Sequence, residues 1–93
     1  MAKLTLAESQ QIAADVGNGL GGVCNDVYDA IKSEPRGPAL QALIERGMAK
    51  VRQYEDALTK LTGAHQRYLK GDYDDQITGL KEDLVALEAK QKG

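Results

Sequence analysis

IKSEPRGPALQAL, residues 31–43, contains the sharpest helix boundary in the chain. Pro35 and Pro38 bracket Gly37, and each proline removes a backbone donor and disfavours helical geometry in the residue before it. A helix therefore cannot continue through this segment. Pro38 instead suits the first turn of a new helix, where its missing N–H would have had no partner. We predict a turn at residues 34–38 that joins two helices into a hairpin.

The segment before the turn has the pattern of a helix over residues 6–33. Thr5 followed three residues later by Glu8 is typical of a capping box at a helix start. Apolar residues then recur at steps of three and four, which is the spacing of one helix face. This helix forms the first half of the predicted hairpin.

A glycine-rich stretch, GNGLGG at residues 17–22, interrupts this first helix. Its spacing fits G-x-G-x-x-G, but no strand pattern precedes it, so we do not expect a dinucleotide site. Each glycine costs a helix roughly 1 kcal/mol relative to alanine. Two interpretations stay open: Gly17 and Gly21 form a narrow helix face that admits another backbone, or the stretch unwinds into a flexible joint.

After the turn, a heptad pattern of apolar residues predicts a second helix over residues 38–70 and a third over 73–91. We expect a break at residues 70–72, because Gly71 suits a left-handed helix cap and Asp72 suits an N-cap. One continuous helix is the alternative, since the apolar step of four carries on through the junction. The tail, residues 90–93, is expected to fray.

These elements predict a single all-α domain, a helical hairpin plus a third helix, in a small bundle or coiled-coil-like assembly. The 93 residues include four Tyr but no Phe or Trp, so the core is thin and self-association would stabilise it. We expect the apolar seams to form an interface with a second copy or with one protein partner. The predicted interface residues are Gly17, Gly21, Leu40, Ile44, Val51, Tyr54, Leu58, Leu61, Tyr68, Ile77, Leu80 and Leu84.

Charge and hydropathy exclude several classes of function. The 12 basic and 14 acidic residues give a net charge of −2, which offers no electrostatic footprint for nucleic acid or an anionic membrane. No apolar run approaches the roughly 20 residues that cross a bilayer, and no Sec-type signal peptide is visible. We expect a protein made in the cytoplasm that does not insert into membranes.

No set of residues predicts catalysis, a cofactor or a metal site. Cys24 is the only cysteine and has apolar neighbours, so we expect a buried small hydrophobe. His65 is the only histidine and has no second ligand at helical spacing, which favours a packed core histidine. Asp72, Asp74 and Asp75 cluster at the predicted helix start, where the helix dipole stabilises carboxylates without a metal. We therefore expect a non-enzyme.

The segment CNDVYDAIKSEPRGPALQALIE, residues 24–45, resembles the centre of type III secretion needle subunits. In that family a first helix ends in a short P-x-x-P loop and a second helix begins with Ala and Leu. The matching positions are Asn25, Asp26, Ala30, Ile31, Lys32, Pro35, Pro38, Ala39 and Leu40. The resemblance implies a helical hairpin, export through the type III apparatus and polymerisation into a tubular filament.

Three functions from different classes fit the sequence. The first is a non-enzymatic assembly protein that self-associates through its apolar seams, with a needle-like filament subunit as its most specific form. The second is an adaptor, secretion chaperone or phage-encoded inhibitor that binds a host protein. The third is an oligomeric helical protein that binds a small ligand or nucleotide between subunits.

Overall fold

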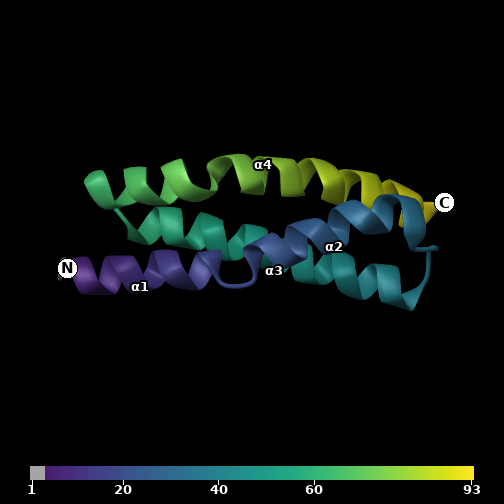
Figure 1. Cartoon of the computed structure of the whole chain (residues 1–93), viewed down its shortest axis with the longest axis horizontal. Helices are drawn as coiled ribbons and strands as arrows, with labels where there is room; N and C mark the ends of the chain where they lie inside the picture. Colours follow the sequence, from purple (N-terminus) through teal and green to yellow (C-terminus); the bar gives the residue numbers. More distant parts are fainter. Residues whose placement is uncertain (1–3) are drawn as a thin grey trace.

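The structure, a computed structural model, describes residues 4–93 and contains four helices in that range: α1 (Leu6–Gly17), α2 (Leu20–Ser33), α3 (Pro38–Lys60) and α4 (Ala64–Lys92). Helices α1 and α2 follow one another along the long axis, α3 runs back beside them, and α4 runs forward again (Figure 1). The result is an antiparallel bundle with three arms, 47 × 21 × 17 Å, in which the first arm is broken. The predicted all-α bundle is confirmed.

The hairpin between α2 and α3 is confirmed, and residues 34–37 form its turn. Gly37 adopts a φ of 152°, and Pro38 is the first residue of α3. The side chain of Gln91 holds this turn from α4: Gly37 N–H donates to Gln91 Oε1 at 2.8 Å, and Gln91 Nε2 donates to the Gly37 carbonyl at 3.0 Å. An ion pair of 3.5 Å between Asp26 and Arg46 joins the two helices beyond the turn.

The first arm begins as predicted but is two helices rather than one. Thr5 and Glu8 form both hydrogen bonds of the capping box. The helix then breaks at Asn18, whose backbone is extended, and Gly19, whose φ of 75° is left-handed. Neither open interpretation was fully right, because Gly17 and Gly21 remain helical while only two residues form the joint.

The predicted break at residues 70–72 is wrong. Helix α3 ends at Lys60, and the chain turns through Leu61 and Gly63, the latter at a φ of 59°. Leu61 leaves the helix to enter the core, where it is 2% exposed, and the turn lies nine residues earlier than expected. Gly71 lies inside α4, so the continuous-helix alternative was right at that junction.

The predicted fraying of residues 90–93 is also wrong, because α4 continues through Lys92. Lys90 Nζ donates to the carbonyls of Ala30 and Ile31 at 2.9 and 3.0 Å, and Gln91 holds the hairpin turn. These contacts tie the last turn of α4 to the end of α2, which leaves the tail no freedom to unwind.

Side chains from other helices cap the C-terminal carbonyls of the first three helices. Lys50 and Gln53 donate to α1 and Lys90 to α2, while Gln66 Nε2 donates to the Leu58 carbonyl at 2.7 Å at the end of α3. The last carbonyls of a helix have no partner within it, so each of these bonds satisfies an acceptor and joins two helices. The polar contacts therefore reinforce the same arrangement as the core.

The core is aliphatic and lies along the middle of all three arms. Its buried apolar residues are Val16, Leu20, Val23, Val27, Ala30, Leu40, Ile44, Tyr54, Ala57, Leu61, Leu69, Ile77, Leu80, Leu84 and Leu87. Tyr54 is the only aromatic residue in this set. The apolar seams predicted from the sequence thus close on one another within a single chain.

Glycine permits a close approach at one of the two predicted positions. A β-carbon on Gly17 would lie 2.9 Å from Cζ of Tyr73 on α4, and closer still to its hydroxyl oxygen. Gly21 faces open space with no atom within 4 Å. The predicted approach of another backbone is therefore not found: the side chain of Tyr73 lies against Gly17, and nothing lies against Gly21.

Candidate functional site

A groove of about 480 Å³ lies between α1 and the first turns of α4, and we call it the α1–α4 groove. Its lining is partly apolar and partly polar, with contributions from both helices. The lining residues are Leu6, Ser9, Gln10, Ala13, Ala14, His65, Tyr68, Asp72 and Tyr73. A volume of this size is within the range of ligand-binding and peptide-binding pockets.

Ser9 and His65 form a hydrogen bond at this groove. Ser9 is 4% exposed, and its Oγ lies 2.7 Å from Nδ1 of His65. A nucleophilic serine must reach its substrate and needs a histidine oriented by a third group. Ser9 is nearly inaccessible to solvent, and within the described range no third group orients His65 among the contacts of this pair, which favours a structural tie between α1 and α4. His65 is half-buried, as expected for a packed histidine.

Two large apolar side chains stand exposed at the edges of the α1–α4 groove. Leu6 on α1 is 57% exposed and Tyr68 on α4 is 69% exposed. Gln10 and Asp72 line the same groove with exposed polar groups. Exposed aromatic and aliphatic side chains beside a few polar groups are typical of protein-binding surfaces.

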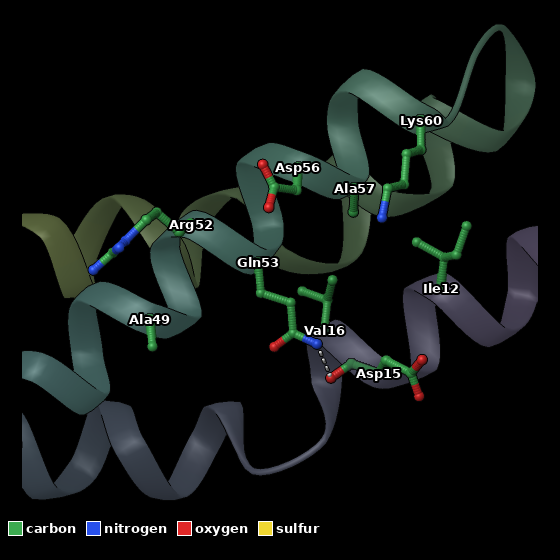
Figure 2. A pocket seen from close by; sticks show the side chains of 9 residues that line it. All are labelled: Ile12, Asp15, Val16, Ala49, Arg52, Gln53, Asp56, Ala57 and Lys60. Carbon is green, nitrogen blue, oxygen red and sulfur yellow. Dashed lines mark hydrogen bonds between the residues drawn. The ribbon is translucent and has the colours of Figure 1, made fainter.

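A second groove, of about 400 Å³, lies on the other flank of α1, between that helix and α3 (Figure 2). Ile12 and Val16 face Ala57 across it, and its outer positions carry charged side chains. Figure 2 shows Gln53 reaching from α3 to the backbone of Asp15, a hydrogen bond of 3.1 Å. Helix α1 therefore has an incompletely filled space on each side.

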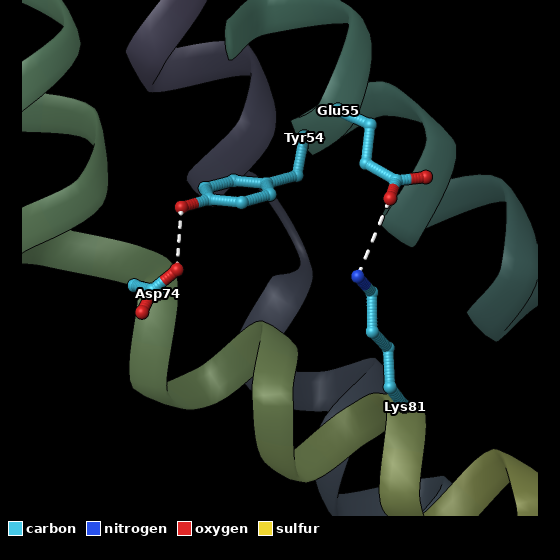
Figure 3. Close-up of polar contacts among 4 residues, drawn as sticks. All are labelled: Tyr54, Glu55, Asp74 and Lys81. Carbon is cyan, nitrogen blue, oxygen red and sulfur yellow. Dashed lines mark hydrogen bonds and ion pairs between the residues drawn. The ribbon is translucent and has the colours of Figure 1, made fainter.

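Polar contacts join α3 to α4 near the middle of the bundle (Figure 3). The Tyr54 hydroxyl donates to Asp74 Oδ1 at 3.1 Å, and Lys81 Nζ lies 3.3 Å from Glu55 Oε2. Burial raises the pKa of Tyr54 to about 12, and the carboxylate of Asp74 adds to the rise. The Glu55–Lys81 pair is exposed on both sides, so its contribution to stability is small.

Most of the predicted interface residues are core residues of one chain. Leu40, Ile44, Tyr54, Leu61, Ile77, Leu80 and Leu84 are buried; Gly17, Val51 and Leu58 are half-buried; Gly21 and Tyr68 are exposed. Of this set, only Tyr68 offers a large exposed side chain for a partner. The sequence identified these apolar positions correctly, and in the structure most of them pack within one chain.

The remaining candidate residues, Cys24, Asp72 and Asp74, have structural surroundings. Cys24 is half-buried, and burial together with the nearby carboxylate of Asp83 raises the pKa of its thiol. Asp72 lies inside α4, so its predicted role as an N-cap is wrong, and Asp74 accepts from Tyr54 instead. Within residues 4–93, no three His, Cys, Asp or Glu side chains gather to hold a metal ion.

Sequence reasoning missed Ser9, Gln10 and Leu6, which supply much of the α1 side of the groove. The position of Ser9 could have been noticed, because it lies three residues before Ile12 and therefore on the same apolar helix face. A hydroxyl at a core position requires a buried hydrogen-bond partner. The lone histidine was therefore a candidate partner for it.

Comparisons of the chain with protein-family models, with curated proteins and with solved structures found no match. None of the helices in the described range has both the length and the apolar character needed to cross a membrane.

Proposed function

We propose that this chain is a non-enzymatic interaction protein, an adaptor or inhibitor that holds another protein against the α1–α4 groove. One observation carries the proposal: Leu6 and Tyr68 stand exposed on the two helices that border a single groove. Exposed apolar side chains that converge on a concave surface are typical of binding sites, whereas isolated ones are common on any protein.

The chemistry of the groove defines the partner. Tyr68 offers a rigid amphipathic ring, and Leu6 offers an aliphatic contact in the same groove. Asp72 is the carboxylate among the lining residues and is exposed. The surface suits a protein segment that inserts an apolar side chain between Leu6 and Tyr68 and places a Lys or Arg beside Asp72.

The closure of the apolar seams supports an adaptor over a homo-oligomer that assembles through those seams. Leu61, Ile77 and Leu84 pack inside one chain and have no exposed surface to offer a second copy. An oligomer built on these residues would first require the bundle to open.

The test uses paired surface variants. Leu6→Ser with Tyr68→Ser removes the rim of the groove, while Tyr28→Ser with Val85→Ser removes two exposed apolar residues of α2 and α4 that do not line it. A partner isolated with the native chain should lose at least about tenfold in affinity for the first variant and bind the control unchanged, as measured by titration calorimetry. Equal binding by both variants would place the partner elsewhere.

A needle-like filament subunit is the second candidate, and the α2–α3 hairpin around Pro35 and Pro38 favours it. Such a subunit would polymerise when pure and concentrated. Electron microscopy of the purified chain over a concentration series would reveal filaments, and a monomeric solution at all concentrations would speak against this candidate.

Ligand binding is the third candidate, and the volume of the α1–α4 groove favours it. A nucleotide or small metabolite seated there would raise the melting temperature of the protein. A thermal-shift screen that is silent for nucleotides and abundant metabolites would remove this candidate.

A further inference from the structure

The α1–α4 groove carries charge of one sign. Among the nine residues that line it within the described range, Asp72 alone has a carboxylate, and none is a Lys or Arg. The other polar side chains of the lining are Ser9, Gln10, His65, Tyr68 and Tyr73. A concave surface whose charge is a carboxylate attracts a cation and repels an anion.

The carboxylate of Asp72 has no cation from its own chain. It is exposed, and the ion pairs found within residues 4–93 involve other carboxylates. A helix places ion-pair partners three or four residues away. Those positions around Asp72 hold no basic residue, since they are Tyr68, Leu69, Asp75 and Gln76. A cation that pairs with Asp72 in the groove therefore comes from another molecule.

Tyr68 stands beside this carboxylate. It lies four residues before Asp72 on α4, so the two side chains leave the same helix face with their β-carbons about 5–6 Å apart. The side chain of Tyr68 is 69% exposed, which leaves its ring open to a ligand. Aromatic faces attract cations, and carboxylates bind them through charge and hydrogen bonds. One cation can therefore contact both groups.

The geometry favours a guanidinium over an ammonium ion. A guanidinium is planar, so it can lie flat on the ring of Tyr68 while the N–H groups at its edge donate to Asp72. Gln10, on the α1 side of the groove, offers a side-chain carbonyl as a further acceptor. An ammonium ion is a compact and more strongly hydrated charge, so it gains less from the ring.

Contacts at two levels fix the register of α1 against α4. Ser9 bonds to His65, and Tyr73 lies against Gly17, and the members of each pair are 56 residues apart in the sequence. The two helices thus run parallel in one register (Figure 1). The groove between them is therefore a straight channel.

This register gives the length of the channel. Asp72 is level with Val16, which lies ten residues after Leu6 along α1, or about 15 Å at the rise of an α-helix. Four to five residues of extended chain span about that distance. One short segment can therefore place an apolar side chain at Leu6 and a cation at Asp72.

We propose that the α1–α4 groove recognises an arginine of the partner protein, whose guanidinium stacks on Tyr68 and donates hydrogen bonds to Asp72. An apolar residue of the same segment, about three positions away, contacts Leu6. This inference rests on the proposed function and deepens it, because it specifies which cation the partner presents.

Short peptides added to the full native chain test the recognition. The probe is acetyl-Leu-Ala-Ala-Arg-amide, and the two comparison peptides carry lysine or citrulline in place of arginine. Citrulline has nearly the shape of arginine but no charge. Titration followed by nuclear magnetic resonance should give the arginine peptide a Kd at least about threefold lower than that of the lysine peptide, and at least about fivefold lower than that of the citrulline peptide. The δ-methylene protons of arginine should shift upfield, because they lie over an aromatic ring.

Paired variants locate the site on the protein. Asp72→Asn removes the carboxylate of the groove, and Glu82→Gln makes the same change at an exposed position of α4 outside it. Tyr68→Leu removes the ring, and Tyr28→Leu is its control on α2. The Asp72 and Tyr68 variants should each weaken the arginine peptide at least about threefold, and the two controls should leave its Kd unchanged. The upfield shift should vanish in Tyr68→Leu alone.

Three results would overturn the arginine site. They are equal Kd values for the arginine peptide and either comparison peptide, no binding of the arginine peptide at about 10 mM, and equal losses in a variant and its control. Each leaves the proposed function standing, because the serine variants of Leu6 and Tyr68 measure the partner itself. The two proposals can therefore fail separately.

Discussion

A methyl group of Leu84 on α4 packs directly against the backbone of Gly47 on α3, so that a β-carbon at Gly47 would stand only 2.6 Å from it. Both residues are buried, and the contact lies where α3 and α4 pack against each other. The absence of a side chain at this position lets the two helices approach closely.

Gly47→Ala should therefore lower the free energy of unfolding by about 1 kcal/mol, because overpacking costs about 1–3 kcal/mol and outweighs the gain in helix propensity. Gly71→Ala is the matched control, since Gly71 is helical and its β-carbon would meet nothing within 4 Å. The control should gain about 0.5–1 kcal/mol. Denaturant unfolding measures both, and a stabilised Gly47→Ala would show that Leu84 moves aside freely.

Ionisation of Tyr54 should make the free energy of unfolding depend on pH in the alkaline range. Burial and Asp74 raise the pKa of Tyr54 to about 12 in the folded chain, above its ordinary value near 10. The folded state thus holds the phenolic proton more tightly than the unfolded state. The resulting stabilisation is complete below about pH 10 and is lost as the pH rises towards 12.

Tyr54→Phe isolates this effect, because it removes the ionising group and the bond to Asp74 but keeps the ring. The native chain should exceed the variant by about 0.5–1.5 kcal/mol at pH 8. That difference should shrink and change sign by pH 12, where the native chain loses about 1–3 kcal/mol by ionisation of Tyr54. Unfolding curves at several pH values measure it, and a difference that is constant with pH would contradict a raised pKa.

Alanine variants at Leu58 and Leu61 distinguish a role in core packing from a role in association. Both belong to the apolar seam that the sequence predicts, but Leu61 is buried in the turn after α3 while Leu58 is only half-buried. Leu61→Ala should cost about 2–4 kcal/mol of unfolding free energy, and Leu58→Ala about half as much. Neither change should alter the mass of the native protein. A change from oligomer to monomer would restore the seam as an interface.

The local signals in the sequence predicted the local structure well. Pro35 and Pro38 end and start helices by covalent geometry alone, and Thr5 caps α1 with Glu8 through bonds between near neighbours. The turn at Gly63 was missed because several glycines offer a positive φ, and burial of Leu61 by residues distant in the sequence selects the one that turns.

The candidate site was less predictable for the same physical reason. Tyr68 was expected at an interface from its spacing, but Leu6 and Ser9 join it only because α1 lies beside the start of α4. The helix caps made by Lys50 and Lys90 could not be predicted from the sequence either, because each lysine donates to carbonyls more than 30 residues away. Sequence periodicity identifies the apolar face of a helix but not the helix that covers it.

Gln91 provides the last prediction, because one side chain near the end of α4 bonds both backbone groups of Gly37 in the hairpin turn. Gln91→Ala should cost about 1–2 kcal/mol of unfolding free energy, since it removes both hydrogen bonds to Gly37, as well as a longer one to Gln41, and leaves the half-buried amide of Gly37 without its partner. Lys92→Ala is the control, because Lys92 is exposed on the same turn of α4. The amide of Gly37 should exchange its hydrogen at least about tenfold faster in Gln91→Ala than in the control, as measured by nuclear magnetic resonance. Equal exchange would mean that Gln91 does not hold the turn and that the geometry of the prolines is sufficient.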